Sequence, residues 1–410
     1  MPPIEQLAGP RELVAALVTP EGRQNPYPVY EELRAHGDLL HIRPGLMMAL
    51  GYAEISHALR SPRLRVQDAR SYDVVHPGWR SHASLRGYTD SMLYTNPPDH
   101  ARLRRLVSKG FSPARVAALR PAIERVTGRL LDRMAGLAAG GTPVDFIAEF
   151  ASRLPIAVIS ELLGVPEDDQ AWFRRVAKDL TIALEGITNV SRIGVADAAM
   201  DELSAYFDEL IGRSRREPRD DIVGALVRAH DDGDRLTHDE LVGNLMLLLT
   251  AGFETTSFLL GHALRLALEQ PRHAARLRGE PGFVTGYVEE VLRFESPVQA
   301  TSRWAETDVD VLGTTVPAGT KLVLVLAAGN RDPRRYTDPG RFDPDRPDVQ
   351  PLSFGAGAHF CLGAPLSRME AQIALPTLLR RFPRIAAAEP PTRRDRWVGR
   401  GLERFPIVLE

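Results

Sequence analysis

The segment from His238 to Glu269 carries the longest uninterrupted helical pattern in this chain of 410 residues. Thr237 precedes it and Glu240 follows three residues later, which is the spacing of a capping box. At about 1.5 Å per residue such a helix would be about 48 Å long and would run through the whole molecule. The chain as a whole is expected to wrap around one site.

The other sequence patterns predict a mainly α chain with a small β portion, an α+β fold in a single domain over residues 1–410. Strands are expected within 41–51, around a turn at Pro44–Gly45, and within 309–326, around Pro317–Gly319. Two segments, 66–96 and 327–353, show little periodicity and are predicted to be irregular. Helices are expected over 28–36, 98–110, 113–136, 154–163, 168–184, 196–213, 283–294 and 364–379.

The composition is that of an ordinary soluble globular chain, with 44% apolar and 25% charged residues. The formal net charge is −2, which gives neither a nucleic-acid nor a polybasic membrane footprint. The N-terminus lacks the basic and apolar regions of a signal peptide, and no stretch of about 18 uncharged apolar residues predicts a membrane span. With a single cysteine, these features predict a cytoplasmic protein.

That single cysteine, Cys361, lies in a glycine-rich segment that runs from Phe354 through Gly355 and His359 to Gly363. One cysteine cannot form an intrachain disulfide or a multi-cysteine zinc site, but it can give one metal a soft thiolate ligand. The glycines allow the backbone to approach a flat ligand closely, and the helix that follows would stabilise a thiolate near its N-terminus. The alternatives are an ordinary buried thiol beside a turn, or a nucleophile with His359 as its base.

The long helical segment contains a second motif, Ala251-Gly252-Phe253-Glu254-Thr255-Thr256. A carboxylate inside an apolar helix is costly unless it is hydrated or paired, and Gly252 removes a side chain where something must approach closely. A mid-helix Thr can bond the carbonyl four residues back and admit water into the ladder. The alternative is a core helix with a satisfied Glu254 and a packing Thr255.

Together the cysteine segment and this helix motif resemble the cytochrome P450 family, the haem-thiolate monooxygenases, in its soluble bacterial, actinomycete-like branch. The resemblance implies the cytochrome P450 fold, with haem b (iron protoporphyrin IX) between the long helix and the cysteine loop. It implies that Cys361 ligates the iron and that Glu254 and Thr255 relay protons. The residues then expected to contact the haem include Ala251, Gly252, Phe354, Gly355 and Gly363.

Glu290 and Arg293 are spaced i, i+3 on one predicted helix, and by themselves predict only a surface salt bridge. The family carries this motif about 70 residues before the cysteine, with a third member from a later element. Phe342-Asp-Pro-Asp-Arg346 matches that element, so Arg346 is expected to join a buried network that holds the cysteine loop to the core.

Haem propionates need cationic or N–H donors. The resemblance assigns one propionate to His100 and Arg104, spaced i, i+4 on one predicted helix, and the other to Arg303. His359 is also expected to face a propionate. Each of these residues taken alone is more typical of solvated surface.

The implied reaction uses dioxygen and two electrons to hydroxylate or epoxidise a small organic substrate, in polyketide or peptide-derived secondary metabolism such as antibiotic biosynthesis. The alternatives are direct use of peroxide, oxidative C–C or C–N bond coupling, and a non-catalytic haem sensor. Electrons are expected from a ferredoxin and an NAD(P)H-dependent ferredoxin reductase, and the chain is expected to be a monomer. Four basic residues are expected either to form a patch that docks the ferredoxin or to be a solvated face. They are Arg102, Arg105, Lys109 and Arg368.

The substrate wall is assigned by family position alone. The connector 186–194 is expected to form part of a mobile lid. The expected wall residues are Trp79, Tyr88, Leu93, Leu247, Ala251, Val298, Gln299 and Val398.

Overall fold

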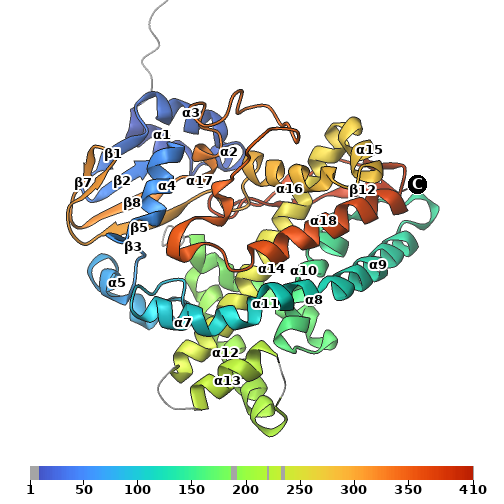
Figure 1. The fold of residues 1–410 in the computed structure, drawn as a ribbon, viewed down its shortest axis with the longest axis horizontal. Helices are drawn as coiled ribbons and strands as arrows, with labels where there is room; N and C mark the ends of the chain where they lie inside the picture. The colour runs from blue at the N-terminus through green and yellow to red at the C-terminus, as the bar shows by residue number, and fades with distance from the viewer. Residues whose placement is uncertain (1–8, 186–191, 219–220, 232–235, 410) are drawn as a thin grey trace, which may run out of the picture. The chain divides into compact units, whose positions relative to one another are not determined.

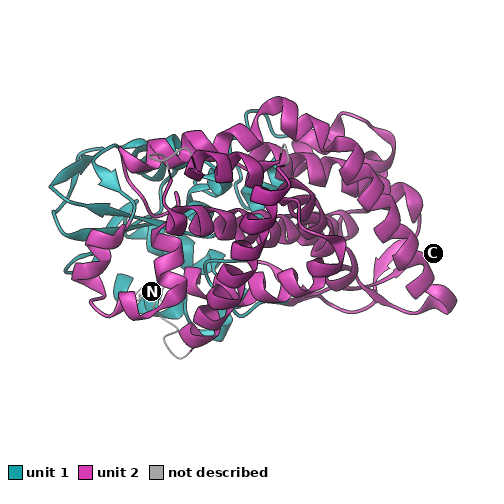
Figure 2. Cartoon of the chain, turned by 90° about the horizontal axis from the view of Figure 1, so that it is seen from below, with its two compact units in different colours: residues 1–66, 289–361, 393–400 teal, residues 67–288, 362–392, 401–410 magenta. Residues whose placement is uncertain are grey.

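A computed structural model of the chain describes residues 9–185, 192–218, 221–231 and 236–409. The chain forms two compact units, each assembled from segments that are distant in sequence (Figure 2). Unit 1 comprises residues up to 66, 289–361 and 393–400, and unit 2 comprises 67–288, 362–392 and the residues from 401 onward. The single domain expected over 1–410 stays a prediction, whereas the mainly α chain with a small β portion is confirmed.

Unit 1 is built on a five-stranded sheet in the order β1-β2-β8-β5-β3, in which only β2 and β8 run parallel. Helices α1 and α3 pack on one face through Leu13, Tyr30 and Leu33, and α4 packs on the other through Ile55 and Leu59. The strands are β1 Leu39–Arg43, β2 Leu46–Ala49, β3 Leu64–Arg65, β5 Thr301–Ala305, β6 Val309–Val311, β7 Thr314–Val316 and β8 Thr320–Leu324. The helices are α1 Pro10–Ala16, α2 Pro20–Gln24, α3 Tyr27–Ala35, α4 Tyr52–Arg60 and α17 Leu326–Gly329.

Unit 2 is mainly helical and is organised around α14, which packs against α10, α11, α18 and α6 (Figure 1). Its helices are α5 Ala69–Val75, α6 Ala83–Thr89, α7 Asp99–Ser108, α8 Pro113–Ala118, α9 Arg120–Leu137, α10 Arg153–Leu163, α11 Gln170–Leu180, α12 Ile193–Arg216, α13 Ile222–Asp231, α14 His238–Glu269, α15 Pro271–Gly279 and α18 Ala364–Arg381. Its strands are β4 Val144–Asp145, β9 Ile385–Ala387, β11 Leu402–Arg404 and β12 Pro406–Leu409, while α16 Phe283–Phe294 and β10 Thr392–Arg393 cross the unit boundary.

Helix α14 begins and ends at the predicted residues. Thr237 Oγ1 accepts a hydrogen bond from Glu240 N at 3.1 Å, and the Glu240 carboxylate accepts one from Thr237 N at 2.9 Å, which completes the capping box. By length and composition α14 is the one helix of the described residues that could span a membrane, but its most apolar window is 83% buried inside the structure. Burial of that kind is expected of the central helix of a core.

Several predicted boundaries were wrong, each for a local reason. Segment 66–96 is not irregular, because it contains α5 and α6. The helix predicted over 113–136 is interrupted at Leu119, since Pro121 lacks the N–H that would continue the first helix and lies in the first turn of α9. The strand pattern over 309–326 contains a further turn in which Leu312 and Gly313 both adopt positive φ. The predicted lid at 186–194 lies largely outside the described residues.

Candidate active site

The glycine-rich segment around Cys361 is a tight loop of unit 1. Gly355 and Gly357 have φ angles of 69° and 70°, which only glycine adopts at no cost. A Cβ on Gly357 would lie 2.5 Å from the Leu59 carbonyl oxygen, so this glycine also lets the loop pack on the end of α4. Cys361 N donates to the Phe354 carbonyl at 2.9 Å, and the Cys361 side chain is exposed. The predicted iron ligand therefore stands on a closed loop whose glycines are required.

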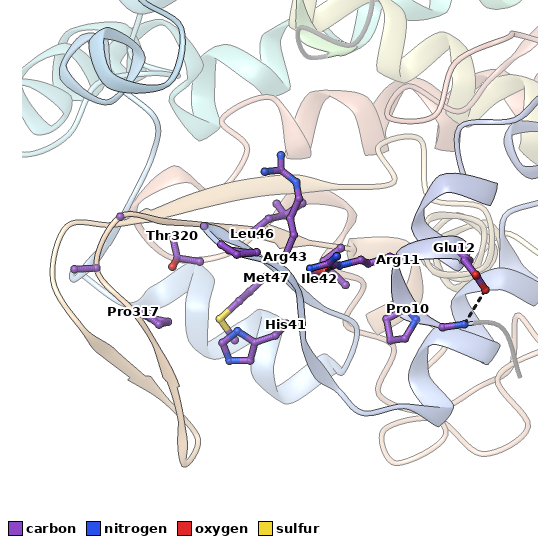
Figure 3. Close-up of a pocket in the computed structure, with 15 residues that line it drawn as sticks. Pro10, Arg11, Glu12, His41, Ile42, Arg43, Leu46, Met47, Pro317 and Thr320 are labelled. Carbon is purple, nitrogen blue, oxygen red and sulfur yellow. Dashed lines mark hydrogen bonds between the residues drawn. The ribbon is translucent and has the colours of Figure 1, made fainter.

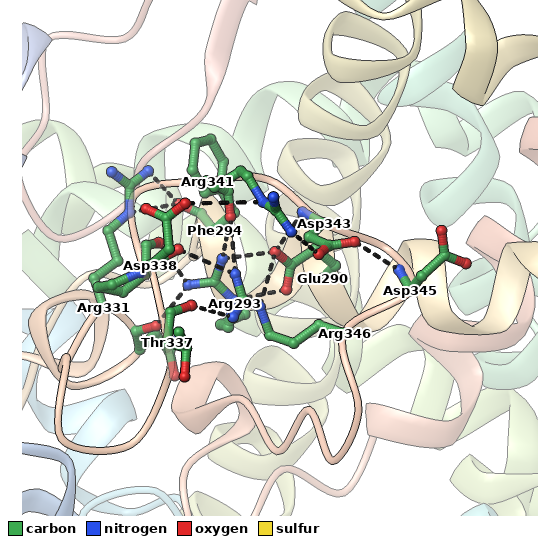
Figure 4. A network of polar contacts seen from close by, with 12 residues as sticks. Glu290, Arg293, Phe294, Arg331, Thr337, Asp338, Arg341, Asp343, Asp345 and Arg346 are labelled. Carbon is green, nitrogen blue, oxygen red and sulfur yellow. Dashed lines mark hydrogen bonds and ion pairs between the residues drawn. The ribbon is translucent and has the colours of Figure 1, made fainter.

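The structure brings Glu290, Arg293 and Arg346 together in unit 1 (Figure 4). Arg293 Nε and Nη2 each donate to a carboxylate oxygen of Glu290 at 2.6 Å, and both side chains are 0% exposed. Arg346 Nε lies 3.6 Å from Glu290 Oε1. Burial excludes the surface salt bridge that the i, i+3 spacing alone predicted. Removing one partner of a buried pair of this kind typically costs about 3–5 kcal/mol, because it leaves the other charge uncompensated.

This network organises the irregular chain that leads to the cysteine loop. Arg293 also donates to the carbonyls of Asn330, Pro339 and Arg341. Asn330 in turn accepts from Leu352 N at 2.7 Å and donates to Ser353 Oγ at 3.0 Å. Leu352 and Ser353 immediately precede Phe354, so the hydrogen bonds lead from α16 to the start of the loop. These contacts support the predicted anchoring role of the network.

The predicted propionate donors occupy buried or partly buried positions. Arg303 on β5 is 4% exposed, and its guanidinium donates to the Ser302 carbonyl at 2.9 Å. Within the described residues it forms no ion pair, and burial lowers the pKa of Arg303 to about 10. A buried guanidinium is costly without an anion, so Arg303 fits the carboxylate of a bound haem. His100 and Arg104 lie one turn apart on α7, with His100 buried, and His359 is partly buried in the turn Gly357–His359.

One side of helix α14 is accessible at the predicted relay motif, and it is called the open side below. From Leu241 to Leu264 every residue is buried except Ala251, Gly252 and Thr255, whose spacing places them close together on the helix. Thr255 Oγ1 donates to the Ala251 carbonyl at 2.9 Å, as predicted, and Glu254 is 5% exposed. These small side chains leave room for a flat ligand. A Cβ on Gly252 would lie 3.2 Å from Ile159 Cδ1. Close packing against α10 is therefore a second reason for glycine at this position, besides the approach of a ligand.

The predicted substrate residues differ in how accessible they are. Trp79, Tyr88 and Leu247 are buried, and Trp79 Nε1 donates to Asp73 at 2.9 Å. Gln299 is 0% exposed, its amide nitrogen donating to the Ser296 carbonyl at 2.7 Å and its amide oxygen accepting from the Tyr30 hydroxyl at 3.2 Å. Its amide therefore has hydrogen-bond partners within unit 1, and the expectation that Gln299 faces a substrate stays a prediction. Three predicted residues are partly accessible: Leu93, Val298 and Val398.

A second buried ion pair, Glu295 with Arg400, was not predicted. Arg400 Nε lies 2.9 Å from Glu295 Oε2, and its terminal nitrogens donate to the carbonyls of Arg23 and Gln24. The Val398 carbonyl, two residues before Arg400, accepts a hydrogen bond from Gln299 N at 2.8 Å. The pair therefore fixes the turn that carries Val398. Partners so far apart in the chain leave no periodic signal in the sequence.

The predicted basic patch is smaller than expected. Arg102 binds the carboxylates of Glu240 and Asp99, with its Nη1 at 3.0 Å from Glu240 Oε2, so its charge is already neutralised. Arg105 and Lys109 are exposed, and Arg368 is partly buried on α18.

A pocket of about 850 Å³ lies in unit 1 beside the β1–β2 hairpin, the turn Pro317–Thr320 and the start of α1 (Figure 3). Arg11 extends across it from α1, and its Nε donates to the Ile42 carbonyl at 2.7 Å. None of the predicted active-site residues lines this pocket, so its volume does not mark the candidate site.

The comparisons with known proteins agree with this geometry. Residues 193–401 match the family model for cytochrome P450. The chain is 41% identical to cytochrome P450 107B1 of Saccharopolyspora erythraea over 87% of each chain. It is 35% identical to 6-deoxyerythronolide B hydroxylase of the same organism, over 94% of this chain and 96% of the hydroxylase. The tirandamycin C-bound monooxygenase TamI superposes with a TM-score of 0.82 at 37% identity, over 94% of this chain and 98% of TamI.

The family model, the sequence relatives and the similar solved structure all point to the same family as the site itself. The site has a glycine-rich cysteine loop, a buried ion network beside it and a buried guanidinium that fits a carboxylate of the haem. The chain therefore belongs to the cytochrome P450 family and is a haem-dependent monooxygenase.

Proposed function

We propose that this monooxygenase inserts one oxygen atom into a small organic molecule of bacterial secondary metabolism, a polyketide or a peptide-derived compound, by hydroxylation or epoxidation. The observation that carries the proposal is the open side of α14, where Thr255 bonds the Ala251 carbonyl beside the buried Glu254. The substrate class rests on similarity to a macrolactone hydroxylase and to a monooxygenase solved with tirandamycin C.

The haem would be held by Cys361 as the iron ligand and by His100, Arg104, Arg303 and His359 at its propionates. When bound, the haem supplies the activation of dioxygen, and the protein orients the substrate and excludes water. Arg303 contributes a buried positive charge, and among the described residues its guanidinium donates only to the Ser302 carbonyl. The Glu290–Arg293–Arg346 network would keep the cysteine loop in place through the chain segment that leads into it at Phe354.

The proton relay is assigned to the Glu254 carboxyl and the Thr255 hydroxyl. The Thr255 hydroxyl donates its hydrogen bond to the Ala251 carbonyl. Rotation about χ1 would turn this O–H group toward the open side of the helix, where it could donate its proton instead. The Glu254 carboxyl, next to it in the sequence, would replace the proton through water. A positioned acid of this kind typically contributes about 10²–10⁴-fold to a rate.

Electrons are proposed to come from a ferredoxin and an NAD(P)H-dependent ferredoxin reductase. Arg105, Lys109 and Arg368 remain as candidate docking residues, since charge complementarity would speed the encounter with an acidic partner. We further propose a cytoplasmic monomer, in keeping with the composition and with α14 buried as a core helix.

The substrate class is tested by a spectral screen of polyketide and peptide-derived metabolites against the haem-loaded protein. A substrate that displaces water from the iron is expected to shift the spectrum from low to high spin. Each hit is then turned over with a surrogate ferredoxin, its reductase, NADPH and isotopically labelled dioxygen. A product that gains one labelled oxygen supports the proposal.

Two other outcomes would contradict it. A product with a new C–C or C–N bond and no labelled oxygen would assign the protein to bond coupling. A haem-loaded protein that consumes no NADPH with any bound ligand would favour a sensor.

A further inference from the structure

A second pocket, of about 270 Å³, lies in unit 2 where α9, α10 and the start of α11 meet. Four arginines line it: Arg129 and Arg133 from α9, Arg153 from α10 and Arg174 from α11. None of the residues assigned to the haem, the proton relay or the substrate lines this pocket. Its apolar lining is provided by Val126, Leu130, Ile156 and Ala157.

The guanidiniums outnumber the carboxylates that face them. Glu149 Oε2 lies 2.9 Å from Arg133 Nε and also 3.2 Å from Arg153 Nε, so one carboxylate serves two arginines. Glu167 Oε2 lies 3.2 Å from Arg129 Nη1. Two carboxylates for four guanidiniums leave an excess of positive charge, although the chain as a whole carries −2.

Arg174 shows this imbalance most clearly. Its Nη1 donates to the Ala148 carbonyl at 3.1 Å and to Ser152 Oγ at 3.4 Å, and no carboxylate of the described chain forms an ion pair with it. Burial lowers the pKa of Arg174, the neighbouring Arg153 lowers it further, and Glu149 offsets only part of this. A partly buried guanidinium beside a like charge is unfavourable until an anion joins it.

The backbone holds two of these guanidiniums in place through a local irregularity. Residues Ile147–Ala151 form a π-helical turn just before α10. The Ala148 carbonyl within this turn accepts from Arg153 Nε and from Arg174 Nη1, each at 3.1 Å. Turns of this type occur frequently at functional sites. A guanidinium has five N–H donors, and among the described residues each of these two arginines donates hydrogen bonds through one nitrogen only, Nε of Arg153 and Nη1 of Arg174.

We propose that this arginine pocket binds an oxyanion attached to a short apolar body, such as a phosphate monoester or a carboxylate. The planar forks of Arg153 and Arg174 match the paired oxygens of either group. The side chains of Leu130 and Ile156 offer apolar surface to the body that carries the anion. A volume of about 270 Å³ limits that body to a few carbon atoms.

The proposal is tested by isothermal titration of the haem-loaded full chain with inorganic phosphate, butyl phosphate and hexanoate, at constant ionic strength. Saturable binding is expected, and the tightest of the three ligands identifies the source of the oxyanion. Arg174→Gln should weaken that binding by about tenfold or more, the loss of roughly 1.4 kcal/mol. Arg174→Lys, which keeps the charge but loses the fork, should lie between wild type and Arg174→Gln.

Arg125→Gln is the matched control, because Arg125 lies on α9 and pairs with Glu161 of α10 outside the pocket. It is expected to leave the affinity unchanged. No saturable binding of any of the three ligands would overturn the proposal. Equal weakening by Arg174→Gln and Arg125→Gln would also overturn it, since that result reports only general charge screening.

Discussion

Glu370 on α18 is a buried acid that the proposed chemistry does not use. It is 1% exposed, its Oε2 has no hydrogen-bond partner among the described residues, and burial raises the pKa of Glu370 well above its usual range. The native protein therefore keeps this proton at pH values where the unfolded chain, with a pKa of about 4.3, has released it. The free energy of unfolding then falls as pH rises above that value. In Glu370→Gln this decline should disappear, so the variant gains stability relative to wild type between pH 5.5 and 8.5, by up to about 1.4 kcal/mol per pH unit.

Urea denaturation across that pH range measures the effect. Glu403→Gln, which removes an exposed carboxylate paired with Lys178, is the control and should follow the wild-type curve. Parallel curves for Glu370→Gln and wild type would show that Glu370 is ionised in the native state.

Thr255 offers a test of the proposed relay with a control in the same helix. Thr250 makes the same kind of bond, from its Oγ1 to the Met246 carbonyl at 3.0 Å, but it is buried, whereas Thr255 lies on the open side of α14. With a substrate from the spectral screen, Thr255→Ala should divert NADPH toward peroxide or water and lower the product formed per NADPH severalfold. Thr250→Ala should form as much product per NADPH as the wild type. If the two variants couple equally well, the hydroxyl of Thr255 has no part in proton delivery.

At the scale of elements, α6 depends on a cap that comes from another helix. Its own N-cap, His82, makes no side-chain cap, and Asp197 of α12 takes over by accepting from Ser84 N at 2.9 Å and from Ser84 Oγ. His82 Nδ1 lies 2.8 Å from the other carboxylate oxygen. Burial alone would raise the pKa of Asp197, but the bonds from Ser84 and His82 hold it below its usual range. The helix that carries Tyr88, which was not predicted, is therefore positioned by one carboxylate.

Asp197→Ala should loosen α6 by about 1 kcal/mol, the usual cost of a lost cap. Amide hydrogen exchange of residues 83–89 should then be about fivefold faster, while exchange in α14 stays the same. Asp201→Ala, an exposed position on the same helix, is the control. Unchanged exchange in 83–89 would mean that α6 is held by its packing alone.

The same helix shows where sequence-based prediction ends. The boundaries of α14 and α16 were predicted because each has a periodic apolar face and a local signal at an end, such as the capping box at Thr237. Segment 66–96 was predicted to be irregular because it shows little periodicity, and the carboxylate that caps α6 lies more than a hundred residues away in sequence. The Glu290–Arg293–Arg346 contacts were expected from a motif match, whereas Glu295 and Arg400 match no motif and were missed. Gln299 was assigned to the substrate wall by family position, which gave no sign that its amide oxygen accepts from the Tyr30 hydroxyl.

At the scale of the whole molecule, haem loading should couple to folding through Arg303. A ligand that binds only the native state stabilises it, by about 2.7 kcal/mol at a hundredfold excess over its dissociation constant. In the haem-free protein Arg303 is a buried charge without an ion-pair partner among the described residues, and a propionate would neutralise it. Haem should therefore raise the melting temperature of wild type more than that of Arg303→Gln, whose haem-free form is relieved of the buried charge.

Calorimetry of the loaded and haem-free forms of both proteins measures this coupling as a double difference. Arg65→Gln is the control, because Arg65 lies on the neighbouring strand β3 and pairs at the surface with Glu306. It should leave the increase in melting temperature on haem loading at its wild-type value. An equal increase in wild type and Arg303→Gln would mean that the charge of Arg303 is balanced by something other than the haem, and the propionate assignment would fall.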